Sequence, residues 1–329
     1  MDRLYAALPD RVAVVDVDDS DAHVRRTTEP TADASLQCVV VSPVDPETVS
    51  CGTADHGLFH SRDAGETWSS AAGVDESRVT SVTVAPTDDG DVRWWAGTEP
   101  SRVYRSRDGE TWTPCDGLTD LPSSSSWAFP PRPHTHHVRW IEVDPHDPDH
   151  LYVAIEAGAL VQSHDAGETW EDRVTGSRRD THSMATHPDA SGRAYCAAGD
   201  GYAESPDCGE TWDHPQAGLD HRYCWSVVVD PTDPDHRLLS SARGAMSAHR
   251  ASAAETYVYE RHGDDPWERV EGLPTGEGIT RYVLATGERR FYALSNAGLF
   301  VSPTGEAWTR LPLSVDDDAT VAGLAVTGR

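Results

Sequence analysis

The sequence contains no lysine. All 27 of its basic residues are arginine, and they are opposed by 55 aspartate and glutamate residues, so the formal net charge is −28. A field this negative repels nucleic acid and anionic lipid, and it keeps a protein soluble where salt screens its self-repulsion. We therefore expect no nucleic-acid partner.

Long apolar runs are also missing. No stretch of 18 apolar residues occurs, and the first ten residues have neither the basic region nor the apolar run of a secretory signal. Only 37% of the residues are hydrophobic. We expect a cytoplasmic protein with no membrane partner. The acidic, lysine-free composition resembles that of proteins from salt-accumulating halophilic archaea.

Several chemical signatures are absent as well. The sequence has no glycine-rich phosphate loop, no G-x-S-x-G turn and no H-E-x-x-H helix. A chain of this length needs no disulfide staples, and no C-x-x-C pair occurs among its cysteines. We therefore expect the cysteines to be reduced, and they are Cys38, Cys51, Cys115, Cys196, Cys208 and Cys224.

One phrase recurs along the chain. Its four clear copies are SRDAGETW at Ser61–Trp68, SRDGETW at Ser106–Trp112, SHDAGETW at Ser163–Trp170 and SPDCGETW at Ser205–Trp212. Two degenerate copies, which match the phrase only in part, end at Trp267 and Trp308. The six tryptophans lie about 48 residues apart on average, which is the length of a four-stranded propeller blade. Between the copies, apolar runs of four to eight residues separated by Gly, Pro and Asp indicate antiparallel strands.

The ends of the chain complete the pattern. Residues 4–28 read as three strands without the phrase, and 320–328 reads as an isolated inner strand. We predict an all-β fold: a single seven-bladed β-propeller of four-stranded antiparallel blades, closed where the C-terminal strand joins the N-terminal blade. The single domain is 1–329, and its blades are expected at 4–28 plus 319–328, 35–72, 78–117, 137–175, 180–217, 222–272 and 279–313.

The recurring phrase resembles the BNR or Asp-box repeat, S-x-D-x-G-x-T-W, of sialidases, xyloglucanases, sortilin-type receptors and photosystem II assembly factors. The resemblance implies a propeller with either a glycoside-hydrolase-like activity or a non-catalytic assembly role. The copy at Ser106 is one residue short, and the Arg-Ile-Pro motif of sialidases is missing, so a typical sialidase is not expected. The phrase itself occupies the third turn of each blade, away from the expected mouth, and we interpret it as structural.

Counting back from the Pro or Gly that ends each predicted first strand identifies the expected channel residues. Six residues before this marker stand Gln37, Thr80, Arg139, His182, Trp225, Arg281 and Ala322. Eight before stand Ser35, Arg78, His137, Asp180, Tyr223, Ile279 and Thr320. Four before stand Val39, Val82, Ile141, Met184, Val227, Val283 and Leu324. Because strand side chains alternate, the three rows share one face, so the channel is expected to be polar at its mouth and apolar below.

Turns and long loops add further groups to the same mouth. The turns between second and third strands carry Asp55, Glu99, Glu156, Asp200 and Arg243. The insertions 117–136 and 240–256 fall on this face, and long loops are often lids or binding loops. We expect these loops to border the site or to hold a protein partner.

The expected chemistry follows from these residue types. Glu156, Asp180, His182 and His137 are the predicted catalytic residues, because two carboxylates flanking a bond are what glycoside hydrolysis needs. The predicted ligand-binding residues are Arg139, Arg281, Tyr223, Trp225, Asp200, Arg243 and Gln37. The arginines would hold an anionic or hydroxyl-rich group, and an aromatic ring would stack on a sugar. An alternative interpretation is structural: the acidic residues of this group only neutralise the charges of Arg139 and His182.

A metal is the further open alternative. His137, His182 and Glu156 would suit a divalent transition ion, and no other cofactor is expected. The sequence thus predicts a propeller that binds a small polar or anionic ligand, including a carbohydrate, with hydrolysis as its activity. The rival hypothesis is a non-catalytic scaffold that holds a protein.

Overall fold

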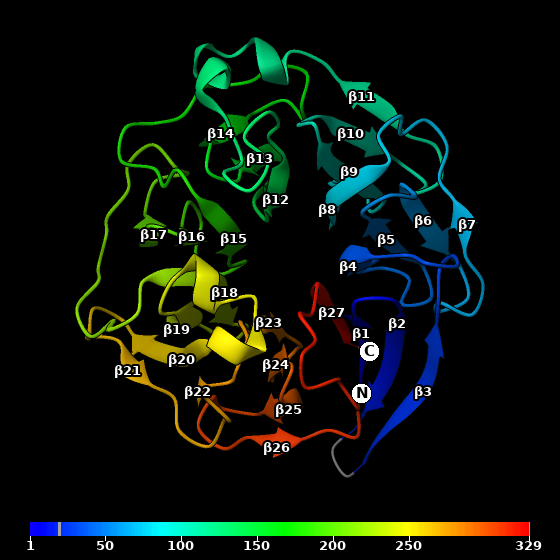
Figure 1. Cartoon of the computed structure of the whole chain (residues 1–329). Helices are drawn as coiled ribbons and strands as arrows, with labels where there is room; N and C mark the ends of the chain where they lie inside the picture. Colours follow the sequence, from blue (N-terminus) through cyan, green and yellow to red (C-terminus); the bar gives the residue numbers. More distant parts are fainter. Residues whose placement is uncertain (19–20, 329) are drawn as a thin grey trace.

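The chain forms a ring of seven small antiparallel sheets around a central axis (Figure 1). The computed structural model describes residues 1–18 and 21–328. Helical structure in these residues is limited to four short 3-10 turns, at Leu118–Asp120, Pro122–Ser126, Ala245–Ser247 and Ala251–Ala253. The predicted all-β, seven-bladed propeller is confirmed.

The strands follow one another outward in each blade. Blade 1 contains β27 (Gly323–Gly328), β1 (Asp2–Ala7), β2 (Val12–Val17) and β3 (Ala22–Thr28). Blade 2 contains β4 (Leu36–Val41), β5 (Val49–Thr53), β6 (Leu58–Ser61) and β7 (Ser69–Ser70). Blade 3 contains β8 (Arg78–Pro86), β9 (Val92–Glu99), β10 (Val103–Ser106) and β11 (Thr113–Cys115).

The later blades vary more in their outer strands. Blade 4 contains β12 (Val138–Asp144), β13 (Asp147–Ile155) and β14 (Ala159–Ser163). Blade 5 contains β15 (Thr181–Thr186), β16 (Ala194–Ala198) and β17 (Gly201–Ser205). Blade 6 contains β18 (Tyr223–Asp230), β19 (Asp233–Ala242), β20 (Glu255–His262), β21 (Glu268–Arg269) and β22 (Gly276–Glu277). Blade 7 contains β23 (Val283–Thr286), β24 (Phe291–Ser295), β25 (Gly298–Ser302) and β26 (Thr309–Arg310).

Blades 4 and 5 correct the prediction of four strands in every blade. Their outermost segments each make only a single bridge, Gln162 with Glu171 and Glu204 with Asp213. Because one bridge does not build a ladder, each of these sheets has three strands.

The two ends of the chain meet in blade 1, as predicted. The inner strand β27 pairs antiparallel with β1, from Asp2 opposite Gly328 to Ala7 opposite Gly323. Leu324 and Val326 of β27 pack into the cluster shared by blades 1 and 7. This pairing covers the inner edge of β1, which could otherwise recruit a strand of another chain.

The inner strands of five blades carry a β-bulge at the same place. Register shifts between the first two strands leave one residue of each inner strand without a cross-strand partner, and these residues are Gln37, Thr80, Arg139, His182 and Trp225. A bulge re-aims the extra side chain, and all five line the central channel.

The bulges also correct the expectation from strict alternation. Met184 and Val227, predicted to line the apolar part of the channel, pack instead in clusters between neighbouring blades. Side chains of a propeller strand point mainly toward the two adjacent blades, so strand alternation alone does not aim them at the axis. Val39, Val82 and Ile141 do line the lower channel, whose volume is about 250 Å³.

The recurring phrase forms a hydrogen-bonded turn in its intact copies. In blade 2, the Asp63 carboxylate accepts hydrogen bonds from the Thr67 amide (2.9 Å), the Thr67 hydroxyl (2.6 Å) and the Ser61 hydroxyl (2.7 Å). The Ser61 oxygen in turn accepts from the Gly65 amide at 2.8 Å. Gly65 has φ +77°, a conformation that glycine adopts without strain. The turn follows the third strand, so it stabilises the fold at the end opposite the mouth.

Replacing Asp63 with alanine is expected to lower the free energy of unfolding by about 1–2 kcal/mol, because three hydrogen bonds are lost. Burial acts to raise the pKa of Asp63, but the bonds from Thr67 and Ser61 outweigh it and lower the pKa to about 2. This contribution is therefore present above the ordinary aspartate pKa and is lost as pH falls toward 2. Urea unfolding at pH 7 and pH 3 measures it. The fully exposed Asp264 is the control, and an Asp264→Ala loss equal to that of Asp63→Ala would contradict the prediction.

Candidate functional site

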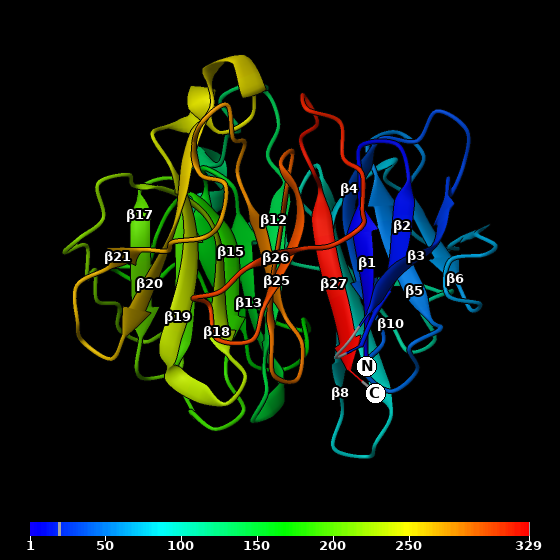
Figure 2. The same cartoon turned by 90° about the horizontal axis from the view of Figure 1, so that it is seen from below.

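A cavity of about 710 Å³ opens at the mouth of the channel. It lies at the end of the propeller from which the loop 240–256 projects (yellow in Figure 2). Both predicted loops border it: Phe129 and Arg132 come from 117–136, and Met246 and His249 from 240–256. The inner strands and their adjoining turns supply Gln37, Arg78, Thr80, His137, Arg139, Glu156, Asp180, Tyr223, Trp225 and Arg281.

Glu156 is the acidic centre of this cavity. It follows β13, and its residue is only 8% exposed. The His137 Nε2 donates to Glu156 Oε2 at 2.9 Å, and the Arg139 Nε lies 3.6 Å from the same oxygen. Burial acts to raise the pKa of Glu156, but His137, His182 and Arg139 outweigh it and lower the pKa to about 2. Glu156 is therefore ionised at neutral pH.

Asp180 provides a second carboxylate, whose pKa is raised where that of Glu156 is lowered. Its Oδ1 accepts a hydrogen bond from the Ala157 amide at 2.8 Å. Burial raises the pKa of Asp180; His182 opposes this, and the negative charge of Glu156 adds to it. Oxygen atoms of the two carboxylates lie within 4.8 Å of each other. The pair thus combines one firmly ionised group with one that holds its proton more readily.

His182 lies between the two carboxylates. Its Nδ1 donates to the Cys224 carbonyl at 2.7 Å, so its Nε2 is the nitrogen that faces Glu156 (3.9 Å) and Asp180 (3.8 Å). This Nε2 is buried without a hydrogen-bond partner. Burial lowers the pKa of His182, against the attraction of both carboxylates. The imidazole is therefore favoured in its neutral form, with a lone pair directed at the acids.

Two arginines cover the indole of Trp225. The guanidinium carbon of Arg281 lies 4.0 Å from the ring centre, and that of Arg139 lies 4.6 Å from it. Trp225 is 6% exposed, so little of its ring is left for the predicted stacking on a sugar. The indole instead supports the two cations.

Arg281 is a buried cation without a counter-ion. It is 8% exposed, and its Nε and Nη1 have no hydrogen-bond partner. Within the described residues, no carboxylate lies within ion-pair distance of its guanidinium. Burial and the charge of Arg139 lower the pKa of Arg281 to about 9, which still leaves it charged at pH 7. Burial of such a charge is unfavourable unless a partner compensates it.

His249 and Arg132 belong to the site although the sequence analysis did not select them. The Tyr223 hydroxyl lies 3.2 Å from His249 Nε2, and the His249 ring packs edge-on against Trp225. Burial and the charge of Arg281 lower the pKa of His249 to about 3, so it stays neutral. Arg132 donates two hydrogen bonds, of 2.7 and 2.6 Å, to Glu99. Both residues lie in the two long insertions, which is the one sequence signal that pointed toward them.

Two predicted ligand-binding residues lie outside the cavity lining. Asp200 faces Arg178, 3.8 Å away, within its own blade. The Arg243 side chain is 63% exposed and pairs with Glu255 at 2.9 Å. Each is held by a local partner of opposite charge, which corrects their predicted place in the central group. Gln37, Arg139, Arg281, Tyr223 and Trp225 do line the cavity.

The comparison with solved structures concerns the fold. No protein-family model matches the chain, and no curated protein sequence does. An ancestral GH74 enzyme superposes with a TM-score of 0.65 at 17% identity, over 86% of this chain and 39% of that one. A GH74 enzyme of Niastella koreensis gives 0.63 at 14% identity, over 92% and 53%. YCF48 bound to D1 peptide gives 0.58 at 16% identity, over 85% and 81%.

This chain shares the propeller fold of these proteins. It spans less than two thirds of the length of either GH74 enzyme. Within the described residues, no helix has the length and apolar character needed to cross a membrane.

The structure changes the predicted metal group. Ligand atoms of Glu156, Asp180 and His182 lie within 4.8 Å of one another, whereas His137 is hydrogen-bonded to Glu156. Asp180 therefore takes the place predicted for His137. The adjacent Arg139 carries a positive charge that opposes a metal cation here.

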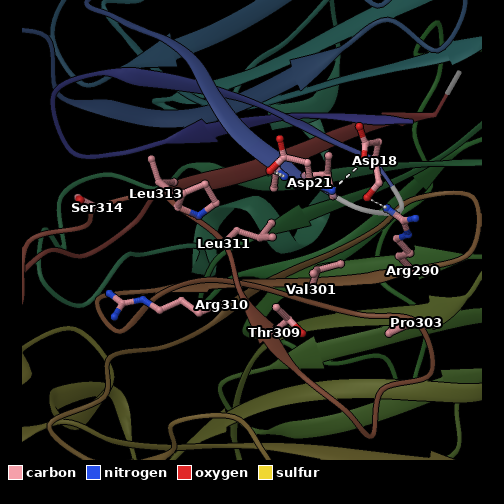
Figure 3. A pocket seen from close by; sticks show the side chains of 13 residues that line it. Asp18, Asp21, Arg290, Val301, Pro303, Thr309, Arg310, Leu311, Leu313 and Ser314 are labelled. Carbon is pink, nitrogen blue, oxygen red and sulfur yellow. Dashed lines mark hydrogen bonds between the residues drawn. The ribbon is translucent and has the colours of Figure 1, made fainter.

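A larger hollow, of about 840 Å³, lies between blades 7 and 1 (Figure 3). Leu311 and Leu313 contribute to its apolar part, and the guanidinium groups of Arg290 and Arg310 lie at opposite ends of it. Its described lining contains no histidine and no pair of converging cations. The mouth cavity, where acids, imidazoles and arginines converge, is therefore the better candidate despite its smaller volume.

Proposed function

We propose that the mouth cavity binds a small anionic ligand through Arg139 and Arg281. The observation that carries this proposal is the buried guanidinium of Arg281, whose Nε and Nη1 have no partner. A carboxylate or phosphate is the natural acceptor for such a group, because planar guanidinium donors match its oxygens. The chain as a whole carries a net charge of −28 and repels anions. Attraction of an anion to this cavity must therefore come from the local arginines.

We further propose that the cavity hydrolyses a glycoside of an acidic sugar. Glu156, ionised at neutral pH, would attack the anomeric carbon as the nucleophile while Asp180, with its raised pKa, protonates the leaving group. Asp180 would then take a proton from the water that releases the sugar from Glu156, which restores both groups. Retaining glycosidases hold their two carboxyl groups about 5–5.5 Å apart, and the closest oxygens of this pair are within 4.8 Å. Arg139 and Arg281 would hold the acidic group of the sugar.

The second candidate function is a scaffold that holds a protein segment. Met246, on the rim of the cavity, is 69% exposed, and the neighbouring Phe129 and Pro130 add apolar surface. YCF48, which shares the fold, has been solved with a D1 peptide. A peptide carboxylate would satisfy Arg281 as well as a sugar acid would, so the two functions differ in hydrolysis and not in charge recognition.

Thermal shift and a chromogenic substrate test the proposal together. We expect glucuronate to raise the melting temperature and an equal concentration of glucose to leave it unchanged, because only the former carries a carboxylate. We expect 4-nitrophenyl glucuronide to be hydrolysed, and Asp180→Asn to slow hydrolysis at least about 100-fold while glucuronate binding persists. Equal responses to glucuronate and glucose would overturn the binding proposal. Glucuronate binding without hydrolysis would favour the scaffold.

A further inference from the structure

Blade 6 carries a separate polar cluster at the end of its strands opposite the mouth. It consists of His236 on β19 with Glu260 and His262 on β20. Glu260 Oε2 lies 3.6 Å from His236 Nε2 and 3.9 Å from His262 Nε2. These distances are too long for hydrogen bonds, so the three groups face one another without bonding. Nothing in the proposed function uses them.

His236 is held in place by a hydrogen bond at one ring nitrogen, and its other ring nitrogen has no hydrogen-bond partner. It is 5% exposed, and its Nδ1 lies 3.3 Å from Asp230 Oδ2, to which it donates. With Nδ1 engaged, Nε2 is the nitrogen left for another ligand; it is buried without a hydrogen-bond partner and faces Glu260. A carboxylate behind a histidine that presents its other nitrogen is the usual support of a metal-ligating histidine.

Blade 4 provides an internal comparison. The phrase D-P-x-D-P-D-H occurs in both blades, as Asp144–His150 and Asp230–His236. Each of these histidines stacks on a histidine near the end of the next strand: His150 on His164, which directly follows β14, at 4.3 Å between ring centres, and His236 on His262, the last residue of β20, at 4.1 Å. The two blades therefore place a stacked pair of imidazole rings at corresponding backbone positions.

One residue distinguishes the two clusters. The position of Glu260, two residues before the outer histidine, is occupied in blade 4 by Gln162. The Gln162 Oε1 accepts a hydrogen bond from His150 Nε2 at 2.7 Å, and this bond closes that nitrogen. In blade 6 the carboxylate leaves the equivalent nitrogen open. Blade 6 therefore has an anionic carboxylate between its two histidines, where blade 4 has a neutral amide that is hydrogen-bonded to His150.

We propose that His236, Glu260 and His262 bind a divalent transition metal ion of the zinc class. Metal–ligand bonds of about 2.0–2.2 Å place the ligand atoms of a tetrahedral site about 3.4 Å apart, close to the separations of 3.6 and 3.9 Å. The His262 side chain is 59% exposed, so its ring can turn toward the ion, whereas Asp230 fixes His236. Of the described arginines, none pairs with Asp230 or Glu260. The site is independent of the mouth.

The position of the site gives the ion a structural role. His262 stands in the fifth copy of the repeated phrase, the degenerate RHGDDPW of blade 6, which lacks the Ser-x-Asp pattern that ties the intact turns. An ion held by His262 and Glu260 on β20 and by His236 on β19 would join these two strands at that turn. We expect it to replace the missing hydrogen bonds of the phrase.

Isothermal titration of the chelator-treated full chain with Zn²⁺, and absorbance with Co²⁺, test the site. We expect one ion per chain with a dissociation constant in the micromolar range or below, and visible Co²⁺ absorbance of the intensity that a tetrahedral site gives and an octahedral aqua ion does not. Glu260→Gln, which copies blade 4, and His262→Ala should each weaken binding at least 10-fold. Circular dichroism establishes that these variants fold.

Two controls separate this site from the other candidates. His164→Ala removes the equivalent ring of blade 4, and Asp180→Asn removes one acid of the mouth cavity; both should bind as tightly as the unaltered chain. Absence of binding, or unchanged affinity in folded Glu260→Gln, would overturn the proposal. A loss of the same ion in Asp180→Asn would place it at the mouth and would overturn the proposal as well.

Discussion

Replacing Arg281 with methionine is expected to make the ligand-free protein more stable and to abolish binding of the anion. The guanidinium is 8% exposed and has two unpartnered nitrogens, so its charge destabilises the folded state. Methionine keeps the unbranched shape without the charge. Replacement of buried ion pairs by apolar residues of similar volume is often neutral or stabilising by about 1–4 kcal/mol, and Arg281 lacks even a pairing carboxylate to offset its burial. We expect a gain in this range by urea unfolding, and at least a 100-fold loss of affinity for glucuronate.

The matched control for this experiment is Arg243→Met. Arg243 lies near the same end of the propeller, but its side chain is 63% exposed and pairs with Glu255. Surface ion pairs contribute about 0–1 kcal/mol, so neither stability nor binding should change much. If Arg281→Met proved destabilising by more than the control, Arg281 would be a satisfied structural residue, and the anion proposal would lose its foundation.

Replacing Glu156 with glutamine is expected to have the opposite effect on stability. Glu156 is the carboxylate that faces His137, His182 and Arg139, so its removal leaves Arg139 without its only close anionic partner in the described cavity. Removing one partner of a buried pair costs about 3–5 kcal/mol. Hydrolysis of 4-nitrophenyl glucuronide should fall with it, because the proposed nucleophile is lost.

The pH dependence gives this prediction a second readout. The pKa of Glu156 is lowered to about 2, below its ordinary value in the unfolded chain. Its contribution to stability is therefore complete above pH 4.5 and is lost as pH falls toward 2. The unaltered chain should lose stability over this range, so that at pH 2 to 3 the free energies of unfolding of the unaltered chain and of Glu156→Gln become similar. A constant difference between the two chains from pH 7 to pH 2 would contradict the assignment.

Glu142→Gln serves as the control for Glu156→Gln. Burial raises the pKa of Glu142 to about 7, and Trp140 and Thr186 donate hydrogen bonds to it. Its charge is thus not stabilised by the fold, and an amide can accept the same bonds. We expect a change of less than about 1 kcal/mol at pH 7.

The fold could be predicted because its information is local and repeated. Six tryptophans about 48 residues apart fix the length of a blade, and unmatched strand-like segments at both ends require closure. The outermost strands were less predictable. After the Glu168–Trp170 part of blade 4, only one bridge forms, and this depends on tertiary contacts that no local pattern records.

Some residues of the candidate site were predicted correctly, but strand alternation is not the reason why they line the cavity. Counting back from Pro or Gly located Arg139, His182 and Trp225, because each is the bulge residue of its inner strand. The bulge itself has no signature in the sequence. The path of a long loop is equally unspecified by periodicity, so the arrival of His249 beside Trp225 could not be derived.

The pairing of β27 with β1 determines the order in which the molecule can be completed. β1 precedes every other strand of the propeller in the sequence, but β27, the strand that covers its inner edge, follows all of them. Until the two strands pair, the chain has an open seam and an uncovered strand edge, which favours association with other chains. Contacts between residues so distant in sequence also form slowly. Damage to β27 would therefore first affect blade 1, although the other three strands of that blade lie at the opposite end of the sequence.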